Sequence, residues 1–175
     1  MLSSIAASFL LGLVSLTHAA PTAIVLTPRA SASDVGDAQN SWAADTSRVS
    51  QFLSAAPDLS GSDLVEQAQA ALDIFNGELA YKAVLDGVFG GDPAVQAAAA
   101  TLARPGTFQF VANGLQQFTT EGAGMDKTAV DILVSRINRA RCRDVLPAID
   151  AYLKAASAFL NNGLLMVANR PDNCQ

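Results

Sequence analysis

The sequence predicts an all-α fold, an antiparallel bundle of five to six helices with one disulfide. Three observations support this prediction. Alanine is abundant, only 6% of residues are aromatic, and no runs of alternating β-branched residues typical of strands occur. Apolar residues recur instead at spacings of three, four and seven, which places them on one face of a helix. Proline and glycine clusters separate these segments by short connections.

The first two predicted helices are long. The first covers residues 33–55 and ends before Pro57. The second covers about residues 60–88 and is stopped by the glycine pair 90–91. The apolar face of the first consists of Val35, Ala38, Trp42, Val49 and Phe52. The inward stripe of the second is expected to be Leu64, Ala68, Leu72, Phe75, Leu79 and Ala83.

Two shorter helices follow. Asp92 and Pro93 combine a preferred N-cap with a preferred first helical residue, so they predict the start of a helix over residues 94–103. Thr107 is expected to cap the next helix, which the glycine-rich segment 121–124 ends. The apolar face of that helix consists of Phe108, Val111, Leu115 and Phe118.

The last two predicted helices contain a break between them. Asp126 starts the fifth, and Asp144 is interpreted as a new N-cap with Pro147 in the first turn of the sixth. Asn162 and Gly163 are typical of a C-terminal cap. The apolar residues 164–168 are expected to pack against the body. The inward residues are Val130, Leu133, Val134 and Ile137, followed by Leu146, Ile149, Leu153, Ala156 and Leu160.

Cys142 and Cys174 are the two cysteines, and an even count in an exported chain indicates a disulfide. One straight helix from residue 142 to 168 would rise about 39 Å, whereas the last six residues span at most about 21 Å. A disulfide needs Cα atoms within about 7 Å. The chain must therefore turn back, either near Asp144 or at residues 161–163.

The N-terminal segment has the pattern of a secretory signal. An apolar run over residues 5–16 precedes small residues, and it is shorter than the ~20 residues that span a bilayer. We expect a signal peptide over 1–19, a leader or pro-segment over 20–31, and one helical domain over 32–175. The expected localisation is extracellular, with cell-wall association as one form of it, and no transmembrane segment is expected.

Charge and composition exclude several function classes. Eleven basic and 16 acidic residues give a net charge of −5, which argues against binding to nucleic acid or anionic lipid. The single histidine, His18, lies in the predicted signal. Histidine-dependent catalysis is therefore excluded from the mature chain, and two thiols alone make a poor metal site. No cofactor and no catalytic residue is predicted, so we expect a protein that is not an enzyme.

Two residue groups allow a functional interpretation beside a structural one. Aromatic side chains could line an apolar ligand cavity between helices, or they could be ordinary core; these are Trp42, Phe75, Phe108, Phe110 and Phe118. Arg136, Arg139 and Arg143 form a basic face, with Arg141 near its apolar edge. This face is either an anion site or a solvated surface, and solvated surfaces are the more common case.

The signal, the histidine-free helical body and the C-terminal segment Asn169–Cys174 resemble small secreted proteins of filamentous fungi. In class the chain is similar to the hydrophobic surface binding protein A and cell-wall mannoprotein family. That resemblance implies a non-enzymatic protein that binds a lipid, a hydrophobic surface or a cell-wall component. The disulfide departs from that family, and no functional residue is transferred from it. A secreted effector or elicitor that acts through protein–protein interaction and an atypical hydrolase are the alternatives, and the oligomeric state stays open.

Overall fold

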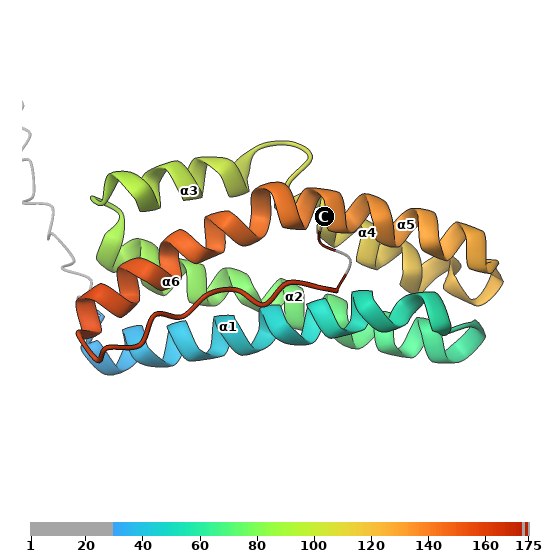
Figure 1. The fold of residues 1–175 in the computed structure, drawn as a ribbon, viewed down its shortest axis with the longest axis horizontal. Helices are drawn as coiled ribbons and strands as arrows, with labels where there is room; N and C mark the ends of the chain where they lie inside the picture. The colour runs from blue at the N-terminus through green and yellow to red at the C-terminus, as the bar shows by residue number, and fades with distance from the viewer. Residues whose placement is uncertain (1–29, 173, 175) are drawn as a thin grey trace, which may run out of the picture.

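A computed structural model describes residues 30–172 and 174 of the chain (Figure 1). The predicted signal peptide and all but the last two residues of the predicted leader lie outside the described residues. Within the described part, every regular element is helical, so the all-α class is confirmed. The α-helices are α1 (Ala32–Ala55), α2 (Gly61–Phe89), α3 (Pro93–Ala103), α4 (Phe108–Glu121), α5 (Lys127–Ala140) and α6 (Leu146–Leu160). The finer arrangement as an antiparallel bundle stays a prediction.

Local capping explains where these helices begin. The Ser31 and Asp34 side chains bond each other's backbone N–H groups at 3.2 and 2.7 Å, so they form a capping box at α1. Asp92 accepts from the Ala94 N–H at 2.7 Å. Asp126 accepts from the Ala129 N–H at 2.8 Å. The predicted starts of the third and fifth helices are therefore confirmed, and each aspartate satisfies a backbone donor that the helix itself leaves free.

The core lies between three principal helix pairings. α1 packs along α2, α2 packs along α4, and α3 packs on α6. The predicted apolar face of the first helix is buried in full, as is that of α5. Of the helices that the structure describes, none combines the length and hydropathy needed to cross a bilayer.

The predicted stripe of α2 is wrong in its second half. Leu79 is 51% exposed and Ala83 is also exposed, whereas Glu78 and Leu85 are buried. At 100° per residue, Leu79 lies about 40° to one side of Phe75, whereas Glu78 and Leu85 lie about 60° and 80° to the other side. The buried face of α2 therefore shifts to the side of Glu78 and Leu85 after Phe75, although the apolar spacing predicted the side of Leu79.

The predicted break at Asp144 is also wrong. A π-helical turn (Arg141–Val145) joins α5 to α6 without reversing the chain, and the Leu146 N–H bonds the Arg141 carbonyl five residues back. A wider turn at this point accommodates Pro147, which has no N–H and a ring that crowds the preceding turn. The Asp144 carboxylate is not a cap; it pairs with Arg143 at 2.8 Å.

The chain reverses instead after α6, at the second site that the disulfide argument allowed. Asn161 has φ +47° and Gly163 has φ +71°, left-handed conformations that glycine adopts without a Cβ clash. The following segment runs back along the molecule, across the view of Figure 1. It brings Cys174 to Cys142 with 5.6 Å between their Cα atoms, so the predicted disulfide is confirmed.

Candidate functional site

The aromatic residues predicted to line a cavity lie mostly in the core. The buried ones are Trp42, Phe75, Phe108 and Phe118. The rings of Phe75 and Phe108 stack with 4.2 Å between centroids, and Trp42 packs on Tyr152 at 5.2 Å. Phe118 meets Phe52 edge-on at 5.8 Å. These distances are those of rings in direct contact, so the rings are each other's packing partners.

Phe110 is the exception among the five. Its ring is only partly buried, and the guanidinium carbon of Arg136 lies 5.7 Å from the ring centroid. Arginine over an aromatic face is a weakly favourable surface contact. The structure therefore does not bring Phe110 together with the four core rings.

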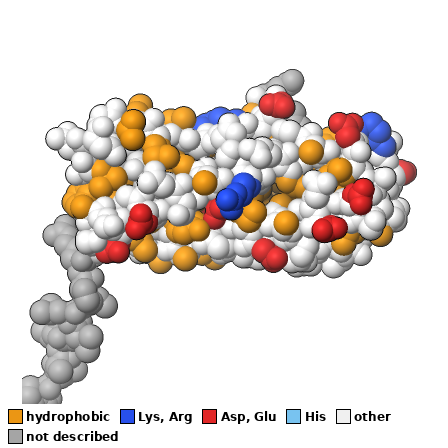
Figure 2. Space-filling model, turned by 90° about the horizontal axis from the view of Figure 1, so that it is seen from below, with side chains coloured by type: hydrophobic (Ala, Val, Ile, Leu, Met, Phe, Trp, Pro, Cys, Tyr) orange, Lys and Arg blue, Asp and Glu red, His pale blue; other side chains and the backbone are white. Residues whose placement is uncertain are grey.

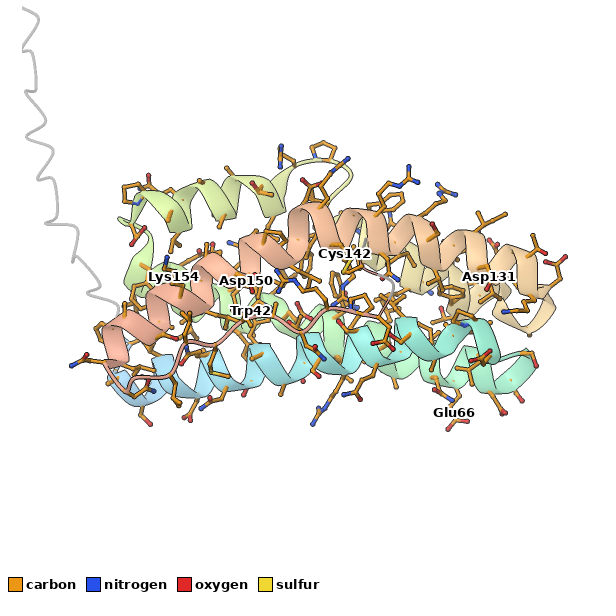
Figure 3. The ribbon with its side chains drawn as sticks, in the orientation of Figure 1. Trp42, Glu66, Asp131, Cys142, Asp150 and Lys154 are labelled. Carbon is orange, nitrogen blue, oxygen red and sulfur yellow. A yellow bond between two sulfur atoms is a disulfide. The ribbon has the colours of Figure 1, made fainter. Side chains whose placement is uncertain are left out.

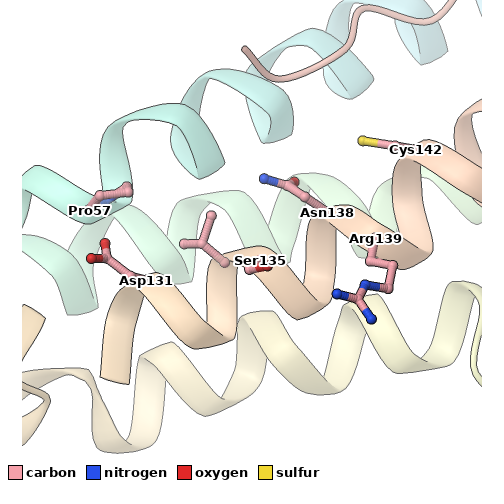
Figure 4. Close-up of a pocket in the computed structure, with 7 residues that line it drawn as sticks. Pro57, Asp131, Ser135, Asn138, Arg139 and Cys142 are labelled. Atoms are coloured by element: carbon pink, nitrogen blue, oxygen red, sulfur yellow. The ribbon is translucent and has the colours of Figure 1, made fainter. Parts of the chain in front are cut away.

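The structure contains a groove of about 440 Å³ along α5 (Figure 4). It is lined by Pro57, Asp131, Val134, Ser135, Asn138, Arg139 and Cys142. None of the five predicted aromatics borders it. Its charged side chains have opposite signs, and the part of the chain that the structure describes has no group of three His, Cys, Asp or Glu residues able to hold a metal ion. The groove thus offers neither an apolar cavity nor a metal site.

The carboxyl of Glu78 is a buried polar group that the sequence analysis did not predict. Glu78 is 1% exposed and accepts a hydrogen bond from the Trp42 indole N–H at 2.9 Å. Burial raises the pKa of Glu78 to about 7, although the Trp42 bond and the charge of Arg141 act in the opposite direction. The only signal in the sequence was position, because Glu78 lies three residues after Phe75.

Arg141 is the second buried charge, and its exposure is 1%. It donates to the Ser50 hydroxyl at 3.2 Å and to the Thr46 carbonyl at 3.3 Å, both on α1. Burial lowers the pKa of Arg141 to about 10, so it remains protonated at neutral pH. Glu78 and Arg141 are enclosed by helices and reach no surface, so we assign them a role in folding rather than in binding.

The exposed large apolar side chains indicate a different candidate site. Six are exposed among the described residues, and four of them lie within residues 159–167, here called the apolar loop. Their exposed fractions are 46% for Phe159, 61% for Leu164, 69% for Leu165 and 59% for Val167. Phe159 also meets Phe89 of α2 edge-on, with ring centroids 5.7 Å apart.

The sequence around the apolar loop carries no charge. Residues 155–169 contain no Asp, Glu, Lys or Arg, and Lys154 and Arg170 flank them. The prediction that residues 164–168 pack against the body is half wrong. Leu164 is exposed; from residue 165 onward, Met166 and Ala168 face inward, whereas Leu165 and Val167 face outward. This alternation is that of an extended segment with one covered face.

Polar contacts hold the chain directly after the apolar loop, at residues 168–170. The Ala168 N–H donates to the Asp150 carboxylate at 2.6 Å, and Arg170 forms an ion pair with the same carboxylate. The Ser50 hydroxyl donates to the Asn169 carbonyl at 2.8 Å. Figure 3 shows Asp150 beside this returning segment and Cys142 further along it. The loop is therefore fixed by α6 at one end and by these bonds and the disulfide at the other.

Hydrophobic side chains also gather over one half of the surface seen in Figure 2, the half in which α1 begins. The first turns of α1 lie beside the end of α6, because Gly36 faces the Leu160 side chain. Asp34 and Asp37 belong to these turns. An anionic partner would meet repulsion there, whereas an uncharged apolar one would not.

Comparisons with known proteins found no match: no family model, no curated protein and no solved structure resembles this chain at a significant level.

Proposed function

We propose that this chain is a secreted, non-enzymatic helical bundle that binds an uncharged apolar ligand or surface through the apolar loop. The observation that supports this is the grouping of Phe159, Leu164, Leu165 and Val167 in one uncharged stretch. Large apolar side chains that are exposed singly need no explanation, but contiguous exposed apolar groups mark contact sites.

The partner is inferred from charge. The net charge of −5 and the acidic first turns of α1 disfavour nucleic acid and anionic membranes. A neutral lipid, a wax or a hydrophobic cell-wall polymer carries no charge, so it does not repel these acidic residues. Adsorption to such a surface is driven by apolar area removed from water, at roughly 25 cal/mol per Å².

The fixed backbone of the loop supports the same function. Ordering a flexible segment on binding costs about 1–2 kcal/mol per residue. The Asp150 bonds and the disulfide hold the returning chain before any partner arrives. Less of the binding free energy is then used to order the loop.

Adsorption of two double variants to alkyl-coated beads tests the proposal. Leu165→Ser with Val167→Thr removes apolar side chains from the loop. Leu79→Ser with Ile132→Thr removes the two exposed ones that lie elsewhere, which are 51% and 55% exposed. We expect the loop variant to lose about tenfold or more in affinity, and the control variant to bind like the original chain. Equal losses in both variants would contradict a localised site.

A further inference from the structure

The turn at the tip of the apolar loop contains an asparagine followed by glycine, a dipeptide that occurs three times in this chain. The three are Asn76–Gly77, Asn113–Gly114 and Asn162–Gly163. All three asparagines are exposed. They differ in backbone setting, since the first lies within α2, the second within α4, and the third in a turn outside any helix.

Backbone setting governs one reaction of this dipeptide. The backbone nitrogen of the glycine, after losing its proton to water, attacks the side-chain amide carbon of the preceding asparagine. The carbon–nitrogen bond of that amide breaks, ammonia leaves, and a five-membered cyclic imide remains. Water then opens either imide carbonyl and leaves aspartate or isoaspartate. The net change is one water consumed and one ammonia released, without any oxidant or cofactor.

The two helical copies are held away from this reaction. The N–H of an interior helical residue donates to the carbonyl four residues back, so the Gly77 and Gly114 nitrogens are engaged. At Gly114 the helices are also close, because a Cβ there would lie 2.6 Å from an Ile137 side-chain carbon. The Asn113 side chain is further held by a 2.9 Å bond from Gln109. Ring closure at either copy requires local unfolding of the helix.

The third copy lies outside any helix, so no helical hydrogen bond holds its glycine nitrogen. The structure shows no acceptor for the Gly163 N–H among the residues it describes. The Leu164 N–H donates to the Asn162 side-chain oxygen at 3.0 Å, which keeps that amide beside the following backbone and draws electron density from its carbon. Apart from its two chain neighbours, no residue has an atom within 4 Å of the position that a Cβ on Gly163 would take, so no other part of the protein crowds this glycine.

We propose that Asn162 is a deamidation site, at which the folded protein forms aspartate or isoaspartate in preference to the same dipeptide in α2 and α4. The product places a negative charge at the tip of a stretch that otherwise has none. If the proposed function holds, this charge weakens apolar binding, because a carboxylate resists removal from water. Slow deamidation at this turn, here called the timer, would then weaken the binding of the adsorbed protein progressively with time.

Peptide mapping by mass spectrometry tests the site. The native secreted protein is incubated at mildly alkaline pH, and a second sample is incubated reduced and denatured. In the native sample we expect Asn162 to convert about tenfold or more faster than Asn76 and Asn113, since those two must first open a helix. In the denatured sample the three rates should become similar. Equal native rates, or an Asn162 that stays intact while the denatured chain converts, would overturn the proposal.

Two variants at position 162 test whether the charge formed by deamidation weakens apolar binding, separately from whether deamidation occurs. Asn162→Gln keeps an amide but would need a less favourable six-membered ring, and Asn162→Asp is one product of the reaction. The two variants share this position and differ in charge, so we expect Asn162→Asp to bind alkyl-coated beads about tenfold less tightly than Asn162→Gln. Equal binding of both would refute the timer and leave the modification site standing. Absence of bead binding by the original chain would refute the proposed function instead.

Discussion

The buried carboxyl of Glu78 should make the stability of this protein depend on pH in an unusual direction. Its pKa is about 7 in the folded chain, against an ordinary value of 4.5. As the pH rises from 4.5 to 7, the unfolded chain releases this proton first, so ionisation favours unfolding. The contribution of Glu78 to stability is therefore complete below pH 4.5 and is lost by about pH 7.

The magnitude follows from the two pKa values. Each pH unit between them is worth about 1.4 kcal/mol per proton, so the loss across the window totals about 3 kcal/mol. Glu78→Gln retains an acceptor for the Trp42 indole but cannot ionise. We expect urea unfolding of this variant to lack that loss between pH 4.5 and 7. The control is Glu66→Gln at the exposed start of the same helix (Figure 3). It should lose stability as the original chain does, and a parallel decline in the Glu78 variant would refute the reasoning.

Two further predictions concern packing and the disulfide. Gly114→Ala should destabilise the fold by about 1–3 kcal/mol, since its Cβ would lie 2.6 Å from an Ile137 side-chain carbon. Gly77→Ala, which meets no atom within 4 Å, should stabilise it by about 0.5–1 kcal/mol; thermal unfolding of both variants compares them, and equal signs would contradict the packing. Replacing Cys142 and Cys174 by serine should cost about 3–4 kcal/mol, because the disulfide closes a 32-residue separation. Denaturant titration measures that loss, and an unchanged midpoint would show that the disulfide does not stabilise the fold.

Features set by neighbouring residues were predictable from the sequence. Asp92 and Asp126 were expected as caps, and both accept the backbone bonds that caps accept. The disulfide was predictable from the even number of cysteines, and the reversal of the chain followed from the disulfide because the last residues span a limited distance. These features depend on contacts a few residues apart, or on distances that the covalent chain limits.

Features set by tertiary contacts were not predictable. The buried position of Glu78 depends on the Trp42 hydrogen bond and on the positive charge of Arg141, and no pattern within α2 shows either of them. Asp144 has the sequence pattern of an N-cap. In the structure, however, a π-helical turn makes room for Pro147, so the helix continues through this point. In each case an interaction outside the local window decided the outcome.

The candidate site shows the same division. The apolar composition of residues 164–168 was evident, and burial was the expected result. Which residues face inward depends on how the returning chain lies on α1 and α6. A bond accepted by the Asp150 carboxylate and a bond donated by the Ser50 hydroxyl fix that register and leave Leu165 and Val167 in solvent.

Carbene footprinting of the protein, free and adsorbed to alkyl-coated beads, tests the central claim most directly. The reagent labels exposed side chains, and mass spectrometry locates the label by residue. We expect adsorption to suppress labelling of Phe159, Leu165 and Val167 while Leu79 and Ile132, which are similarly exposed, keep theirs. Suppression of all five to the same extent, or of the latter two alone, would contradict a binding site at the apolar loop.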